Sequence, residues 1–172
     1  MGSGVLVVHA SLAGVDPGSM KILYRFTDKD LTEKEISAIT KEINTKVSLS
    51  NAVFEFDGVI LSRATLVIKG MHSKLSSHII GTDPLCQRQG SLGAVNNETD
   101  NLVVKSKPLP GCQDLKEAVE SASLVNEFTE KSHIVLGNAS FNKERIALHK
   151  KPVNMILCCC AVDYQQNVNK HE

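Results

Sequence analysis

Two neighbouring runs of apolar residues near the start of the chain predict strands. The first, Val5 to Leu12, is rich in β-branched residues, and the second, Met20 to Phe26, alternates apolar and polar side chains at several positions. Between them stands Val15-Asp16-Pro17-Gly18, in which proline fixes φ and glycine tolerates positive φ, as turns require. We therefore predict two antiparallel strands joined by this turn.

The next pattern has helical spacing and predicts a helix that begins at Thr32. Residues 32–35 form a capping box, in which Thr32 and Glu35 each accept a hydrogen bond from the other's backbone N–H. The apolar residues that follow at helical spacing are Ile36, Ile39, Ile43 and Val47. Because charged residues occupy the other face, the segment predicts an amphipathic helix that packs one side against a sheet.

A hairpin is predicted where Asp57-Gly58 separates two apolar runs. The alternating run 53–56 precedes this pair, and the longer run 59–68 follows it. Asp-Gly is a favoured hairpin turn because both residues tolerate positive φ. A buried helix over 59–69 is the alternative, which the β-branched content disfavours.

The second half of the chain has a less regular pattern. Glycines, prolines and a polar run at 96–100 predict a long polar loop at about 81–101. The elements predicted beyond it are a strand at 102–104, an amphipathic helix over 114–128, short strands at 133–136 and 145–148, a core strand over 153–162, and a flexible tail from about 164.

This order of elements predicts an α+β fold, which is a mainly antiparallel sheet with two amphipathic helices packed on it. The chain has 172 residues, a common length for one domain, so we expect residues 1–172 to form a single domain. Residues 20–69 and 101–150 share a coarse strand-helix-strand-strand order, which leaves open a weak internal β-α-β-β duplication.

Composition and charge exclude several classes of function. The chain holds 19 basic and 19 acidic side chains, whereas a dedicated nucleic-acid binder carries a basic excess. Only 4% of the residues are aromatic and tryptophan is absent, which disfavours a surface that stacks bases. No apolar run approaches the roughly 18 to 20 residues of a membrane span, and no basic-flanked leader opens the chain. We expect a soluble intracellular protein of the cytoplasm, with the nucleus as a second location.

His9 and Ser11 are the candidate catalytic residues. The segment Val8-His9-Ala10-Ser11 resembles the His-x-Ser/Thr box of the two-histidine phosphoesterases, in which one histidine acts as base and a second as acid. The second box is missing, because no other histidine is followed two residues later by Ser or Thr. The resemblance implies a small phosphoesterase-like enzyme, and the competing interpretation is a strand histidine at a sheet edge.

The chain has one basic cluster, which is a candidate binding surface. Its residues are Lys143, Arg145, Lys150 and Lys151. Such a cluster could bind RNA weakly, or an acidic partner. The alternative is a solvated strand edge, on which lysines block unwanted pairing with another sheet.

Three consecutive cysteines, Cys158, Cys159 and Cys160, lie in the predicted core strand. On a regular strand Cys158 and Cys160 point to one face and Cys159 to the other. Because the run holds no cation, we expect three buried and mostly unreactive thiols. A metal–thiolate cluster, a redox switch and S-acylation are the alternatives. The chain has five cysteines, an odd number that suits a reducing compartment.

These patterns together predict a non-catalytic binding or assembly subunit of an intracellular multiprotein complex, with other protein subunits as its partners. The sequence contains no complete catalytic signature, phosphate loop or metal-binding motif, so no cofactor or metal is expected. The alternatives are an enzyme that uses His9 and Ser11, and a weak RNA-binding subunit that uses residues 143–151.

Overall fold

The computed structural model describes residues 4–27, 29–60, 63–89, 92–95 and 100–163, which contain a five-stranded antiparallel sheet. Its strands are β1 (Val5–Val15), β2 (Ile22–Arg25), β3 (Ala52–Ile60), β4 (Arg63–Gly70) and β7 (Met155–Asp163). The other elements are α1 (Glu33–Lys46), α2 (Lys116–Gly137), α3 (Ser140–Ala147) and a small hairpin of β5 (Cys86–Gln89) and β6 (Leu92–Val95). The predicted α+β fold is confirmed, with three helices where the sequence predicts two.

β1 lies at the centre of the main sheet and pairs along both of its edges. β7 runs along one edge. Along the other edge, β4 pairs with residues 5–10 and β2 pairs with residues 13–15, so these two strands lie end to end. β3 pairs with the outer edge of β4. Residues in the middle of β1 are therefore surrounded by β4, β2 and β7.

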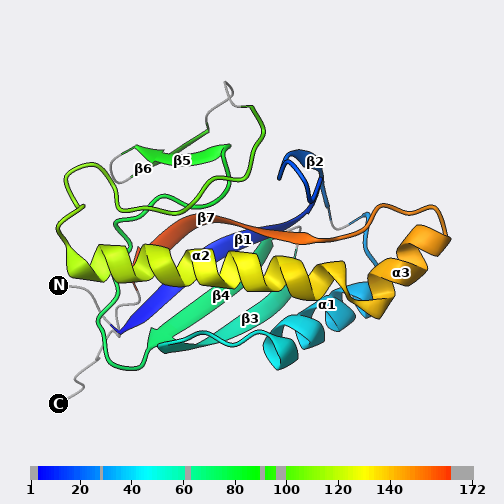
Figure 1. Cartoon of the computed structure of the whole chain (residues 1–172), viewed down its shortest axis with the longest axis horizontal. Coiled ribbons are helices and arrows are strands. Elements are labelled where there is room, and N and C mark those ends of the chain that lie inside the picture. The colour runs from blue at the N-terminus through cyan, green and yellow to red at the C-terminus, as the bar shows by residue number, and fades with distance from the viewer. Residues whose placement is uncertain (1–3, 28, 61–62, 90–91, 96–99, 164–172) are drawn as a thin grey trace, which may run out of the picture.

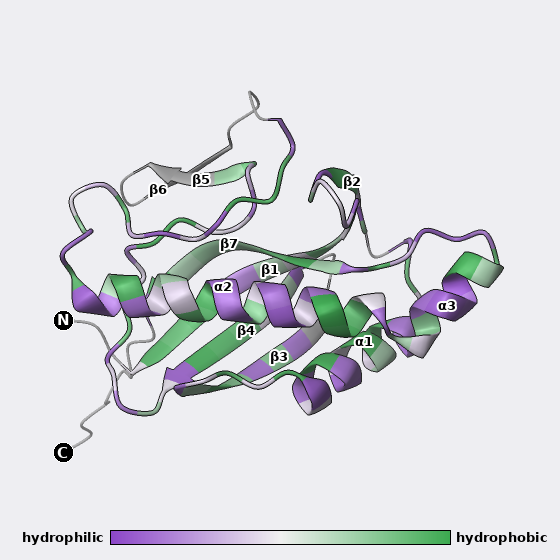
Figure 2. Ribbon diagram, viewed as in Figure 1, coloured by the Kyte–Doolittle hydropathy of each residue, from purple (hydrophilic) through white to green (hydrophobic). Residues whose placement is uncertain are grey.

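The helices α1 and α2 cover one face of this sheet. Figure 1 shows α2 lying across the strands, with α1 beside it. The residues of β1 buried beneath them are Leu6, Val8, Ala10 and Leu12. Figure 2 shows hydrophobic residues along the strands that α2 crosses, and alternating hydrophilic and hydrophobic patches on α1 and α2. Because side chains alternate along a strand, His9 and Ser11 point to the opposite face.

The outer edge of β7 is covered by the segment from Gly81 to Asp83. The backbone N–H groups of Thr82 and Asp83 both donate to the carbonyl of Cys158, at 2.8 and 3.1 Å. The Cys158 N–H donates in return to the Thr82 hydroxyl at 2.9 Å. Glycine permits this approach, since a Cβ at Gly81 would lie 2.1 Å from the Cys158 carbonyl oxygen. The segment is thus tied to the strand that carries the three consecutive cysteines.

The predictions for the first helix and for the antiparallel strands β1 and β2 are confirmed. α1 follows Thr32, whose hydroxyl accepts from the Glu35 N–H at 3.2 Å, while the Glu35 carboxylate accepts from the Thr32 N–H at 3.1 Å. Ile39 and Ile43 are buried on its inner side. The predicted core strand is confirmed as β7.

The hairpin of β3 and β4 is also present, but its turn is not at Asp57-Gly58. β3 continues through both residues to Ile60, and β4 begins at Arg63. The register of the two strands shifts between Asp57 and Ile60. Gly58 therefore lies at a strand irregularity, which is the other common use of glycine in a strand.

Two predicted strands, 133–136 and 145–148, are wrong. α2 continues to Gly137, and α3 covers most of the second segment. Short apolar runs of this kind do not distinguish helix from strand. Without these strands the two halves of the chain no longer share an element order, and the duplication is not supported.

The structure changes the picture of three further segments. Leu102 forms an isolated bridge with Lys21, so the strand predicted at 102–104 is wrong. The segment predicted as a loop, 81–101, contains the hairpin of β5 and β6. The predicted flexible tail from about 164 lies outside the described residues. In the part of the chain that the structure describes, no helix is long and apolar enough to cross a membrane.

Candidate functional site

A cavity of about 710 Å³ brings together residues from five parts of the chain. The side chains that define its chemistry are those of His9 and Ser11 on β1, Arg25 on β2, Arg63 on β4, Asp83, Cys86 on β5, and Cys159 and Cys160 on β7. We call this the β1 cavity. Its volume is in the range of small-molecule sites. The two residues predicted as catalytic, His9 and Ser11, do lie in one cavity.

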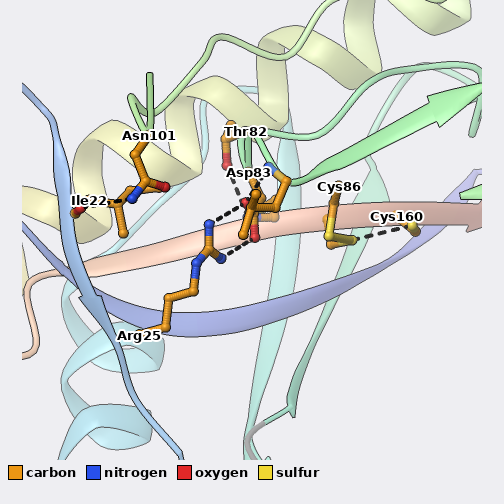
Figure 3. Close-up of polar contacts among 10 residues, drawn as sticks. Ile22, Arg25, Thr82, Asp83, Cys86, Asn101 and Cys160 are labelled. Carbon is orange, nitrogen blue, oxygen red and sulfur yellow. Dashed lines mark hydrogen bonds and ion pairs between the residues drawn. A yellow bond between two sulfur atoms is a disulfide. The ribbon is translucent and has the colours of Figure 1, made fainter. Parts of the chain in front are cut away.

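Arg25 is held in the β1 cavity by a two-point ion pair with Asp83 (Figure 3). Its two terminal nitrogens donate to the two Asp83 oxygens at 2.6 and 2.8 Å. The Asp83 side chain is only 3% exposed, whereas that of Arg25 is 31% exposed. Asp83 also accepts from the Leu85 N–H at 3.0 Å. The pair therefore fixes the guanidinium and joins β2 to the segment that covers β7.

His9 stands in the middle of β1, at a bulge in the neighbouring strand. It pairs with Thr65 of β4 on one side. On the other side Val8 pairs with Ala161 and Ala10 pairs with Cys158, so two residues of β7 oppose His9. His9 is exposed, and Ser11 is half-buried. The bulge thus places two residues of β7, Cys159 and Cys160, beside His9 where it faces the cavity.

The charges of the β1 cavity favour an anion. Arg25 and Arg63 contribute two permanent positive charges, and Asp83 contributes one negative charge. His9 and Ser11 add side chains that can donate hydrogen bonds. Guanidinium groups bind carboxylate and phosphate oxygens through paired N–H donors. The chemistry of this cavity therefore fits a small anionic ligand.

Three of the four predicted binding residues line a second cavity, of about 470 Å³. These residues are Arg145, Lys150 and Lys151, and they share it with His149 and Asp30. Lys143 lines a different cavity, beside Ile146. The interpretation of this cluster as a strand edge is wrong, because the residues lie on α3 and in the turn after it.

Arg145 is committed to contacts within the fold. It is buried, and its Nη1 lies 2.8 Å from the Glu35 carboxylate of α1. Its Nε donates to the Lys151 carbonyl at 2.8 Å, and its guanidinium lies 5.5 Å from the centre of the Phe26 ring. Arg145 therefore joins α1, α3 and the following turn, which leaves Lys150 and Lys151, together with Asp30, as exposed charged residues of this cavity.

The three consecutive cysteines have three different environments. Cys158 is fully buried, and burial raises the pKa of its thiol to about 12, as expected for an unreactive core thiol. The prediction of three buried thiols is wrong for the other two residues, because Cys159 forms a disulfide with Cys86 and Cys160 is only half-buried. Because the bulge breaks the alternation of β7, Cys159 and Cys160 both line the β1 cavity, and the predicted alternation is wrong there. Among the described residues, no group of three or more His, Cys, Asp or Glu side chains could hold a metal ion.

Sequence reasoning missed four residues of the β1 cavity: Arg25, Arg63, Asp83 and Cys86. Arg25 and Asp83 are 58 residues apart, and Cys86 and Cys159 are 73 apart. No local motif connects residues at such distances. The one available signal was that Arg25 and His9 stand in two strands predicted to pair, which places them in the same sheet.

Comparison with known proteins identifies related sequences. A family model described as 2,3-bisphosphoglycerate-independent phosphoglycerate mutase matches residues 1–142. A relative with the same description from Aeropyrum pernix is 28% identical over 146 residues, which are 84% of this chain and 34% of the relative. Another, from Saccharolobus solfataricus, is 27% identical over 170 residues, which are 95% of this chain and 36% of the relative. The chain thus spans about a third of the length of these curated relatives.

A solved structure has a similar fold. It is the cofactor-independent phosphoglycerate mutase from Thermoplasma acidophilum, with a TM-score of 0.70 and 20% sequence identity. The match covers 94% of this chain and 37% of that one.

These findings overturn the functional prediction made from the sequence. The matching family is a family of enzymes, so the prediction of a non-catalytic assembly subunit is wrong. The RNA-binding and two-histidine phosphoesterase alternatives are wrong as well, because the matching family and relatives are described as phosphoglycerate mutases. The prediction rested on missing motifs, and active sites whose residues are scattered along a chain have no such motifs.

Proposed function

The chain belongs to the 2,3-bisphosphoglycerate-independent phosphoglycerate mutase family, and from this premise we propose that its β1 cavity binds the phosphoglycerate substrate of such a mutase. The single observation that carries the proposal is the convergence of Arg25, Arg63, His9 and Ser11 on one cavity. A phosphoglycerate carries a phosphate and a carboxylate, and arginine side chains suit both groups.

Each residue has a distinct role in this proposal. Arg63 is exposed and lines the cavity, so its guanidinium can donate hydrogen bonds to a ligand that enters from solvent. Arg25 is held by Asp83, so it offers a positive charge in a fixed position in the cavity. His9 and Ser11 point from the same face of β1, and each can donate a hydrogen bond to a ligand oxygen. The set combines two cations with two further hydrogen-bond donors, as phosphate and carboxylate sites commonly do.

The proposal concerns substrate binding and not the complete reaction. The chain spans about a third of the length of the relatives it matches. In those relatives, the two thirds outside the match can hold the other groups that a mutase needs. We also propose a cytoplasmic location, since the phosphoglycerate that the family's name specifies is a water-soluble metabolite.

Isothermal titration calorimetry with 3-phosphoglycerate tests the proposal. We expect saturable binding by the chain, and at least about tenfold weaker binding by Arg63→Gln, since a hydrogen bond to a charged group contributes about 1.5–3 kcal/mol. Lys41→Gln is the matched control, because Lys41 is exposed on α1 and does not line the cavity. Glycerate, which lacks the phosphate, should bind more weakly. Equal binding by both variants would contradict the proposed site.

A further inference from the structure

Three sulfur atoms gather on the wall of the β1 cavity. Cys86 is bonded to Cys159, and the Cys160 sulfur lies 3.4 Å from the Cys159 sulfur. Figure 3 shows Cys160 on the far side of the disulfide from Cys86, with a dashed contact between the disulfide and the Cys160 sulfur. All three residues are half-buried and line the cavity. A free thiol therefore stands directly beside a disulfide.

The bulge in β7 explains this arrangement. On a regular strand the side chains of Cys159 and Cys160 would point to opposite faces of the sheet. Here both residues oppose His9, because Val8 pairs with Ala161 and Ala10 pairs with Cys158. A bulge can re-aim a side chain in this way. It places two neighbouring sulfurs on the cavity side, within contact distance of each other.

We propose that Cys86, Cys159 and Cys160 form a thiol–disulfide exchange site. The Cys160 thiol loses its proton to water, and the resulting thiolate attacks the Cys159 sulfur. A Cys159–Cys160 bond forms as the Cys86–Cys159 bond breaks, and the electron pair leaves with the Cys86 sulfur, which then takes up a proton. One disulfide replaces another, so no external oxidant or reductant is consumed.

The burial of the sulfurs supports the exchange, because Cys86 and Cys160 are both half-buried and line the same cavity. Cys158, by contrast, is fully buried on the helix side of β7 and its pKa is raised by burial, so it stays out of the exchange. The strand thus separates one inert thiol from two sulfurs that can react.

The exchange changes how the small hairpin is held. β5 pairs with β6 in a sheet of their own, and the Cys86–Cys159 bond joins this sheet covalently to β7. Transfer of the bond to Cys160 frees Cys86, while Asp83 stays held by Arg25. One wall of the β1 cavity is then released. This inference goes beyond the proposed substrate binding and does not depend on it.

Cysteine labelling followed by peptide mapping tests the exchange. The native chain, purified without added thiol, is treated with iodoacetamide, quenched in acid and digested. We expect a share of the molecules to carry the label on Cys86 together with a Cys159–Cys160 disulfide, and the rest to carry it on Cys160. In Cys160→Ser the label on Cys86 should fall at least tenfold, because its disulfide cannot exchange.

Cys112→Ser is the matched control, since it removes a free thiol that does not line the β1 cavity, and it should leave the Cys86 label unchanged. Three outcomes would overturn the proposal: label on Cys160 with none on Cys86, equal labelling of Cys86 in the native chain and in Cys160→Ser, or label on Cys86 and Cys159 within the same molecules. None of these measurements uses phosphoglycerate, so they are independent of the proposed substrate.

Discussion

Gly81 is a single residue on which the closure of the β7 edge depends. A Cβ at this position would lie 2.1 Å from the carbonyl oxygen of Cys158 and 2.3 Å from that of Cys159. Both contacts are with backbone atoms, which cannot rotate away as the end of a flexible side chain can. We expect Gly81→Ala to lower the free energy of unfolding by about 1–3 kcal/mol, measured by denaturant unfolding. Gly137→Ala is the control, because a Cβ at Gly137 meets no atom within 4 Å. Equal losses in the two variants would contradict the contact.

The buried thiol of Cys158 makes the free energy of unfolding depend on pH in the alkaline range. Burial raises its pKa from 9.0 to about 12, so the unfolded chain loses this proton first as the pH rises. The associated stability is complete below pH 9.0 and is lost between 9.0 and about 12. We expect Cys158→Ala to be less stable than the native chain at neutral pH, through lost packing, but to show a shallower decline in alkali. Parallel unfolding free energies of the two proteins above pH 9.0 would contradict the assignment.

α1 is an element whose start depends on two side chains. Thr32→Ala removes the acceptor of the Glu35 N–H, and we expect a loss of about 1 kcal/mol in the free energy of unfolding. Thr45→Ala in the last turn of the same helix is the control, since Thr45 is exposed and outside the capping box. Urea unfolding of both variants makes the comparison. Similar stabilities would mean that the capping box adds nothing to this fold.

The elements that could be predicted are those whose pattern is local and apolar. α1 has its capping box and its apolar repeat in one continuous segment, and β1 is a continuous β-branched run. The second half of α2 was missed because it buries polar residues. Thr129 and Ser132 are buried there, and their hydroxyls donate to the carbonyls of Val125 and Thr129 within the helix. Such bonds satisfy a hydroxyl locally, so burial does not require an apolar residue.

At the scale of the whole molecule, the candidate site was only partly predictable. His9 and Ser11 could be found because they stand two residues apart on one strand. The Arg25–Asp83 pair and the disulfide are made by segments that meet only when β2, β5 and β7 are in place. The sequence shows these residue types but not their partners. The single-domain assignment and the partner subunits stay predictions.

The charge balance of the molecule indicates where an anion would be attracted. The formal net charge is zero, so the field of the whole chain does not favour an anion. Attraction must come from the local excess of positive charge in the β1 cavity. Asp83 is the carboxylate among the residues that line this cavity, and it accepts hydrogen bonds from both terminal nitrogens of Arg25. Its charge therefore limits how strongly Arg25 can hold a second anion.

Asp83→Asn should accordingly separate stability from ligand binding. We expect a loss of about 1–3 kcal/mol in the free energy of unfolding, because the ion pair disappears while its partly exposed arginine stays hydrated. We also expect 3-phosphoglycerate to bind several-fold more tightly at low salt, since Arg25 is then free to meet the ligand, with a smaller gain at high salt. Denaturant unfolding and calorimetry at two salt concentrations measure both effects. Weaker binding by a folded Asp83→Asn variant would mean that Asp83 orients Arg25 for the ligand instead of competing with it.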